Sequence, residues 1–268
     1  MKETEMAIKN VTIFRVALPP FIFCLLVLSI LEFIVRGGFV ASYLVPPPSL
    51  IVIDIIENPF MFFNGVLVTG IESVFGFVFA AVFAFGLSLI FAMYSSIDRS
   101  VFPLLVALKC MPLVAFAPIL GLWFGGGSMV AKGLLAGFIC FFPIIVNLRT
   151  GLNTIDQEAL DLFQSLSSSR WSMFWKLLFP SAMPYYLSGL KTSSTLAVIG
   201  AVVGEFANSD KGLGFIIMEA SYQGNAIRMF SSVLILMLLG LFLFGIMSLI
   251  DLWVRKILRI DLKNGLDR

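Results

Sequence analysis

Long apolar segments separated by polar connections dominate the hydrophobic pattern of the chain. A helix that crosses a membrane needs roughly 20 mostly apolar residues, and this sequence contains six segments that are long enough. They lie near residues 16–35, 65–94, 101–124, 129–148, 185–206 and 229–252. A strand of a membrane barrel would need only about 10 residues of alternating character. The pattern therefore predicts an all-α integral membrane protein with six transmembrane helices.

The composition supports lipid as the solvent for most of the chain. Of the 268 residues, 59% are hydrophobic and 13% are charged, whereas soluble domains average about 25% charged residues. A water-soluble domain of this size could not hide so much apolar surface. The net charge of +2 is too small to indicate a nucleic-acid partner.

Residues suited to catalysis or metal binding are scarce. The chain has no histidine, which removes the commonest general base and the commonest metal ligand. Its cysteines, Cys24, Cys110 and Cys140, lie far apart in separate apolar runs, as expected of small hydrophobic residues rather than of a disulfide framework or a metal site. We predict no catalytic residue, no metal site and no cofactor in this chain.

The distribution of lysine and arginine predicts the orientation. With a cytoplasmic N-terminus, twelve basic residues fall inside and three outside, as the positive-inside rule requires. The inside set is Lys2, Lys9, Arg15, Arg99, Arg149, Arg170, Lys176, Arg255, Lys256, Arg259, Lys263 and Arg268; the outside set is Arg36, Lys211 and Arg228. Residues 1–15 and 253–268 are then cytoplasmic tails around a six-helix transmembrane domain at 16–252. The first apolar segment lacks a small-residue cleavage site, so we expect it to be retained.

The longest cytoplasmic connection, 151–184, joins the fourth and fifth spans and begins with a predicted helix. Thr154 to Gln157 form a capping-box pattern, and acidic residues follow in the first turns. Leu160, Phe163 and Leu166 recur at a spacing of three, which gives the helix one apolar edge. Such a helix could lie on the lipid surface or dock into a groove of a partner protein, and the pattern alone favours neither.

Serines at 167–169 are predicted to break this helix, and a second helix is expected over residues 170–179. Its apolar residues Trp171, Phe174, Trp175 and Leu178 share one face, which suits the membrane interface. Pro180 is predicted to end the second helix.

Counted back from Pro180, the loop resembles the cytoplasmic signature of binding-protein-dependent ABC importer permeases. That signature is E-A-A, three residues, G, nine residues and I-x-L-P. Asp161-Leu162-Phe163, Ser167 and Leu177-x-Phe179-Pro180 stand at every required spacing. The literal Glu158-Ala159 pair lies in a different register and does not fit.

The rest of the chain resembles the nitrate/sulfonate/taurine-type branch of this family over residues 43–256. The matching motifs are MPLVAFAPIL at 111–120, LWFG at 122–125, FFP at 141–143, SRW at 169–171, GLK at 189–191 and GLGF at 212–215. The chain departs from the family at Ser167, where the signature has glycine, at Leu162 and Phe163, where it has alanines, and at Glu72, where a basic residue is frequent. These changes suggest a co-adapted partner.

The resemblance implies an obligate complex in the bacterial inner membrane. It would contain a second copy of this chain, two cytoplasmic ATPase subunits and an external solute-binding protein, with the loop helix acting as a coupling helix that rides in a cleft of the ATPase. The residues that would couple to the ATPase are Glu158, Leu160, Asp161, Phe163, Leu166, Ser167, Ser168 and Arg170. The sequence contains no G-x-x-x-x-G-K-[ST], so ATP and Mg²⁺ would be bound by the partner ATPase.

Candidates for the translocation path are the ionisable residues and prolines of the spans. Glu72, Lys109, Lys191 and Glu205 are functional hypotheses because ionisable groups inside membranes are costly, although each lysine could also reach an interface. Pro112, Pro118 and Pro143 could bend gating helices or only aid packing. For Gly76, Gly86, Gly133 and Gly137 close helix packing is the favoured interpretation.

Three other classes of protein compete with the importer permease. A self-sufficient secondary transporter would show internal repeats and central carboxylates, an intramembrane enzyme would need a clustered catalytic pair, and an assembly factor would not need the docking loop. The resemblance implies a small anion such as nitrate, a sulfonate or taurine as the substrate, with a thiamine precursor, riboflavin or another aromatic solute as the alternative.

Overall fold

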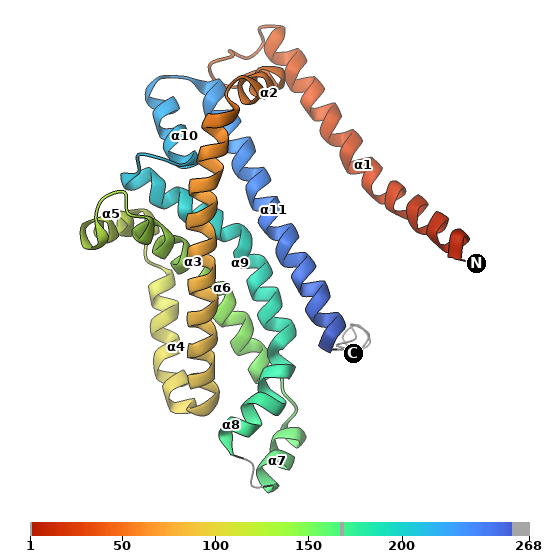
Figure 1. The fold of residues 1–268 in the computed structure, drawn as a ribbon, viewed down its shortest axis with the longest axis vertical. Helices are drawn as coiled ribbons and strands as arrows, with labels where there is room; N and C mark the ends of the chain where they lie inside the picture. The colour runs from red at the N-terminus through yellow and green to blue at the C-terminus, as the bar shows by residue number, and fades with distance from the viewer. Residues whose placement is uncertain (1, 167–168, 259–268) are drawn as a thin grey trace.

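The protein is a bundle of long helices, described here from a computed structural model that covers residues 2–166 and 169–258 (Figure 1). No strand occurs in these two ranges. The elements are α1 (Lys2–Arg36), α2 (Pro48–Glu57), α3 (Pro59–Met93), α4 (Ser95–Lys109), α5 (Leu113–Phe124), α6 (Met129–Asn153), α7 (Gln157–Ser165), α8 (Arg170–Met173), the π-helical η1 (Phe174–Leu178), α9 (Phe179–Asn208), α10 (Leu213–Tyr222) and α11 (Ala226–Leu258).

The all-α membrane fold is confirmed. Over the described residues, five segments are long and apolar enough to cross a membrane, and the count becomes six when α4 and α5 are taken as one broken span. The helices exceed the predicted bounds at both ends of the chain. α1 takes in residues 2–15, which were expected to form a tail, and α11 runs to Leu258.

The third predicted span, 101–124, is not one continuous helix. α4 and α5 meet at an angle of 100°, and Figure 1 shows α5 lying across the direction of α3. The break falls at Cys110–Pro112, where Pro112 provides no N–H and disfavours helical geometry for Met111. Pro118 and Pro143, by contrast, lie inside the continuous helices α5 and α6.

The core forms where α6 packs between α3 and α9, and it depends on small residues. A Cβ added to Gly200 on α9 would lie 2.5 Å from the Cα of Ala136, and one added to Gly76 on α3 would lie 2.6 Å from the amide of Gly137. Gly133 is equally crowded, and a Cβ on Gly137 would lie 3.0 Å from the carbonyl oxygen of Gly76, so the packing role predicted for Gly76, Gly133 and Gly137 is confirmed. Gly86 is the exception, because no atom approaches it within 4 Å.

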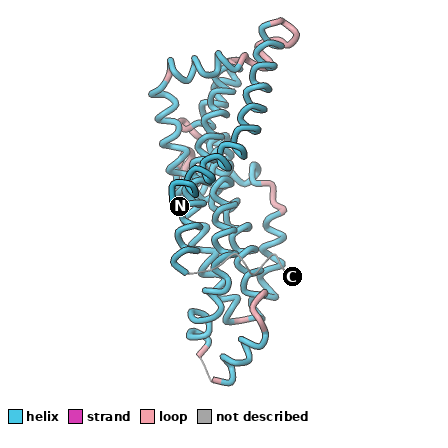
Figure 2. The backbone as a smooth tube through the Cα atoms, turned by 90° about the vertical axis from the view of Figure 1, so that its right-hand side faces the viewer, coloured by secondary structure: helices cyan, strands magenta, loops and turns pink. Residues whose placement is uncertain are grey.

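α1 stands away from the rest of the bundle in Figure 1, and in the view turned by 90° its N-terminal end lies in front of the other helices (Figure 2). It is attached near its outer end, where Glu32 accepts hydrogen bonds from the backbone amide of Ser49 at 3.0 Å and from Arg36 Nε at 2.5 Å. α2, which lies in the predicted external connection, provides Ser49. Phe23 and Phe33 on α1 stay largely exposed, as expected for a helix with lipid or another chain beside it.

Candidate functional site

The first helix of the predicted coupling loop, residues 151–184, is α7, which lies at the end of the molecule opposite α2 (Figure 1). The predicted capping box is wrong, because the cap is Asp156 rather than Thr154. Asp156 accepts the amide of Glu158 on Oδ1 at 3.2 Å and the amide of Leu160 on its carbonyl. Thr154 instead donates from its hydroxyl to the carbonyl of Gly151, at the end of α6. An aspartate at this position also suits the positive end of the helix.

The apolar edge of α7 differs from the predicted one. Leu162 and Leu166 are 57% and 67% exposed and lie one helical turn apart. Leu160 and Phe163 are only half-exposed, and Leu160 lines a cavity beneath the loop. The outward face therefore joins Leu162 and Leu166 with the exposed carboxylates of Glu158 and Asp161. Of the predicted coupling residues, Ser167 and Ser168 lie outside the described ranges.

The second half of the loop continues directly into the fifth span. Ser169 caps α8 by accepting the amide of Ser172 at 3.2 Å, and η1 then leads into α9 without a break. The prediction that Pro180 ends this helix is wrong. In the π turn the amide of Phe179 bonds to the carbonyl of Phe174, and Pro180 follows in the first turn of α9, where a missing N–H is tolerated.

The aromatic stripe of this segment is divided between two surroundings. Phe174 and Leu178 are buried in the bundle, whereas Trp171 and Trp175 remain 54% and 42% exposed. The two indole rings meet edge to face with centroids 5.7 Å apart. The tryptophans are therefore the part of the stripe that is free to meet lipid headgroups.

Two arginines connect this loop to the turn between α3 and α4. Arg170 donates from Nη1 to the carbonyl of Met93 at 2.8 Å, and its guanidinium lies 5.6 Å from the ring centroid of Tyr94. Arg149, near the end of α6, binds Asp98 through two hydrogen bonds of 2.7 and 2.9 Å. A cavity of about 300 Å³ lies beside the contact of Arg149 with Asp98, lined by Asp98, Arg149 and Leu160 among others.

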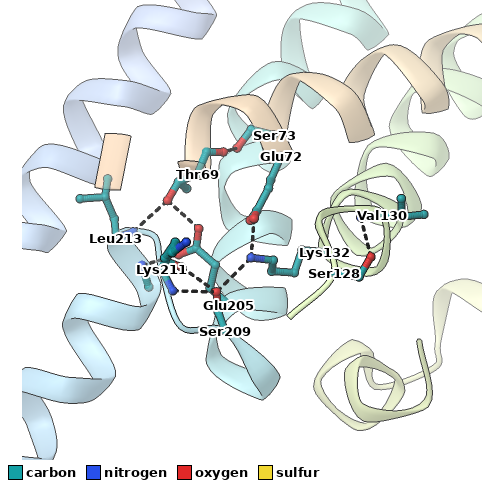
Figure 3. A network of polar contacts seen from close by, with 11 residues as sticks. Thr69, Glu72, Ser73, Ser128, Val130, Lys132, Glu205, Ser209, Lys211 and Leu213 are labelled. Atoms are coloured by element: carbon teal, nitrogen blue, oxygen red, sulfur yellow. Dashed lines mark hydrogen bonds and ion pairs between the residues drawn. The ribbon is translucent and has the colours of Figure 1, made fainter. Parts of the chain in front are cut away.

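A buried polar cluster lies where α3, α6 and the end of α9 meet (Figure 3). It consists of Thr69 and Glu72 on α3, Lys132 on α6, and Glu205 and Ser209 at the end of α9. Lys132 Nζ is 2.5 Å from Glu72 Oε1 and donates to Ser209 Oγ at 2.9 Å. The side chains of Lys132 and Glu72 are only 6% and 2% exposed, so the ion pair is shielded from solvent.

Glu205 caps α10 within this cluster. Its Oε2 accepts the amide of Gly214 at 2.5 Å and its Oε1 accepts the hydroxyl of Thr69 at 2.6 Å, while Thr69 accepts the amide of Leu213 at 2.9 Å. Gly212 has φ +107°, and a Cβ there would collide with the Glu205 carboxylate. The glycines of the GLGF motif therefore leave room for the buried carboxylate of Glu205 at the positive end of α10.

The cluster has two carboxylates and one ammonium group. Glu72 Oε2 is buried and has no hydrogen-bond partner among the described residues, so Lys132 is the cation that Glu72 depends on. Sequence reasoning left Lys132 unassigned, although a lysine inside an apolar span was the signal that could have identified it. Glu72 and Glu205 were both predicted candidates, and the structure brings them together.

The other path candidates lie apart from this cluster. Lys109 is exposed in the last turn of α4, next to the break at Pro112. Pro118 lies inside α5. Lys191 on α9 places its Nζ 4.9 Å from the ring centroid of Phe244 on α11. The predicted path candidates thus lie in separate parts of the bundle, and their role in a path remains a prediction.

Comparison with known proteins identifies the family of the chain. Residues 76–256 match the family model described as binding-protein-dependent transport system inner membrane component. The formylaminopyrimidine transport permease protein ThiX of Halalkalibacterium halodurans is 35% identical over 84% of this chain and 90% of its own length. The riboflavin transport system permease protein RibX of Chloroflexus aurantiacus is 32% identical over 58% of each chain, and the putative aliphatic sulfonates transport permease protein SsuC of Bacillus subtilis is 26% identical over 80% and 78%.

A solved structure shares the fold. A chain of the MetNI methionine ABC transporter in inward-facing conformations superposes with a TM-score of 0.64 and 17% identity, covering 73% of this chain and 96% of that one. At this identity the likeness supports the fold alone. The family match covers well over half of the chain, and the chain therefore belongs to the family of inner membrane components of binding-protein-dependent transport systems, as a permease of the ABC type.

Proposed function

We propose that this chain is the membrane-spanning permease subunit of an ATP-driven importer and that it forms the translocation path together with a second copy of itself. The observation that carries the proposal is α7, a short helix that projects from one end of the bundle with Leu162 and Leu166 outward. An isolated helix of this length is not stable by itself. Its exposed apolar edge, flanked by Glu158 and Asp161, suits a groove on a cytoplasmic ATPase.

The proposed orientation places α7, α8 and both termini in the cytoplasm of a bacterium, with the protein in the inner membrane. Twelve of the basic residues fall on this side by the count of the sequence. α2 and the start of α10 then lie on the external side, where a solute-binding protein would dock. ATP and Mg²⁺ would be held by the ATPase subunits, since the sequence has no phosphate-binding loop.

For the substrate, we propose a nitrogen heterocycle of the thiamine-precursor or flavin class. The pyrimidine and riboflavin permeases are 35% and 32% identical to this chain, whereas the sulfonate permease is 26% identical.

Purification of the tagged chain from its host in mild detergent tests the class. We expect an ATPase subunit to co-purify in equal amount, and the complex to hydrolyse ATP during uptake in liposomes. A chain that purifies alone and transports a solute without ATP would be a secondary transporter, and the proposal would be wrong.

The captured solute-binding protein tests the substrate. Its thermal unfolding can be followed with formylaminopyrimidine, riboflavin, taurine and nitrate, one at a time. We expect one of the two heterocycles to raise the unfolding temperature and the two anions to leave it unchanged. Stabilisation by taurine or nitrate would favour the small-anion alternative while leaving the permease assignment intact.

A further inference from the structure

Both ends of the coupling loop are fastened to the same short segment of chain, at residues 93–98. Before α7, Arg149 binds Asp98. After α7, Arg170 binds the carbonyl of Met93 and faces the ring of Tyr94. α7 therefore lies in the chain between two arginine contacts that both reach the junction of α3 and α4. Arg149 near the end of α6 binds Asp98 on α4, and Arg170 on α8 binds Met93, the last residue of α3.

The contacts are strong enough to transmit a displacement. The pairing of Arg149 with Asp98 uses both oxygens of the carboxylate, an arrangement that fixes orientation as well as distance. The guanidinium of Arg149 also lies 3.9 Å from the ring centroid of Phe102, one turn further along α4. A planar guanidinium held on two sides behaves as a rigid connection, which a lysine would not supply.

The cavity beneath the loop gives α7 room to move. It measures about 300 Å³ and is lined by Leu160 of α7 and by Asp98 and Arg149, which form one of the two arginine contacts. A well-packed interior resists displacement, whereas a half-exposed helix above a cavity of this size can shift without a collision. The motion would be passed to residues 93–98 through the arginines.

α4 carries such a displacement away from the loop. It is a helix of 15 residues, which corresponds to about 22 Å at the rise of an α-helix. It ends at the 100° bend, where Cys110, Met111 and Pro112 separate it from α5. A break without continuous helical hydrogen bonds is the place where the angle between two helices changes most easily.

We propose that Arg149 and Arg170 are positioning residues that pass a displacement of α7 to α4 and so change the bend between α4 and α5. This proposal rests on the proposed function, in which the ATPase moves α7. It adds a second route, since α7 is also joined to the core directly through α6 and α9.

The whole complex in lipid nanodiscs tests the proposal with Cys110 as the reporter. Cys110 is exposed at the bend, Cys140 is buried, and the exposed Cys24 is replaced by alanine. We expect the rate of maleimide labelling of Cys110 to differ by about threefold or more between the nucleotide-free and ATP-trapped states. In Arg170→Ala this difference should disappear, and the number of substrate molecules transported per ATP should fall by about tenfold, as when a charge-assisted hydrogen bond is lost from a coupling.

Two further variants keep the test decisive. Arg170→Lys retains one donor for the Met93 carbonyl and should restore part of both readouts, and Arg255→Ala removes an ion pair within α11 and should change neither. The inference would be overturned if the labelling rate of Cys110 were the same in the two nucleotide states of the unmodified complex. It would also be overturned if the rate still differed between these states in Arg170→Ala. A complex that imports without using ATP would instead overturn the proposed function, so the two failures are distinguishable.

Discussion

Lys132 on α6 and Glu72 on α3 form an ion pair of 2.5 Å in a part of the bundle that solvent does not reach. The second oxygen of Glu72 has no partner in the described structure, so the lysine alone offsets the charge of this carboxylate. Lys132→Ala should therefore leave a buried charge unpaired, at a cost of about 3–5 kcal/mol of folding free energy. Thermal unfolding in detergent measures this loss.

The double variant Glu72→Leu with Lys132→Met is the control. Replacing both partners of a buried pair with apolar residues is often close to neutral, so it should recover most of the stability that Lys132→Ala loses. Equal destabilisation by the single and double variants would show that packing, rather than the unpaired charge, sets the cost.

Thr69 connects Glu205 to the start of α10, because its hydroxyl donates to the carboxylate and accepts the amide of Leu213. Thr69→Val preserves the shape and leaves two buried groups without a partner. The expected loss is about 1–3 kcal/mol in thermal unfolding. Thr150→Val removes an exposed hydroxyl bond to the carbonyl of Val146 and should change the unfolding temperature much less. Similar shifts for the two variants would contradict the structural role of Thr69.

The exposed edge of α7 predicts which residues meet the ATPase. Leu162→Asp places a charge on a side chain that is 57% exposed, so it should abolish co-purification of the ATPase while the bundle keeps its unfolding temperature. Phe163→Asp should also uncouple ATP hydrolysis from transport. Because Phe163 is half-exposed, this variant should in addition lower the stability of the loop, which hydrogen exchange of 157–166 would detect.

A comparison of these two variants shows whether the outward face has been assigned correctly. If Leu162→Asp transports normally and Phe163→Asp does not, the docking edge is the predicted set Leu160, Phe163 and Leu166 instead. If neither variant affects transport, α7 does not dock as proposed.

Close packing at Gly200 predicts a fourth outcome. A Cβ at this position would lie 2.5 Å from the Cα of Ala136, and backbone atoms cannot move aside as a flexible side chain does. Gly200→Ala should cost about 1–3 kcal/mol through overpacking of α6 against α9. Gly240→Ala is the matched control on α11, with no atom within 4 Å, and it should gain roughly 0.5–1 kcal/mol from helix propensity. Thermal unfolding of both variants measures these changes. If Gly200→Ala were more stable than Gly240→Ala, the close packing at Gly200 would be contradicted.

The spans and the family could be predicted because they depend on local composition and on motif order. Six apolar segments, the spacing counted back from Pro180, and the GLGF motif were all readable from the chain. The bend at Pro112 was only partly readable, since a proline inside a predicted span signals a kink but does not set its angle. The continuation of helix through Pro180 was missed, because a π turn is not visible in the hydrophobic period.

The buried cluster could not be predicted from the sequence. Whether Glu72 and Lys132 face each other depends on how α3 and α6 are rotated about their axes, which the sequence does not show. Thr69 and Glu205 are separated by 136 residues and pose the same difficulty. One part was accessible, since an acidic residue shortly before Gly-Leu-Gly at the start of a helix is a capping arrangement. The exposed face of α7 could not be predicted, because a spacing of three places Leu160 and Phe163 together but does not show which side meets the bundle.

The π turn of η1 sets the rotation of α8 about the helix axis, because α8 precedes it on the same continuous helix. Each residue of an α-helix advances the chain by about 100° around the axis, and a π turn holds one residue more than an α turn. Deleting one residue from Phe174–Leu178 would restore α geometry and swing Arg170 about 100° away from the carbonyl of Met93. The five residues of η1 therefore set the direction in which the preceding loop points about the helix axis. A chain without the extra residue would present its loop to an ATPase at a different angle.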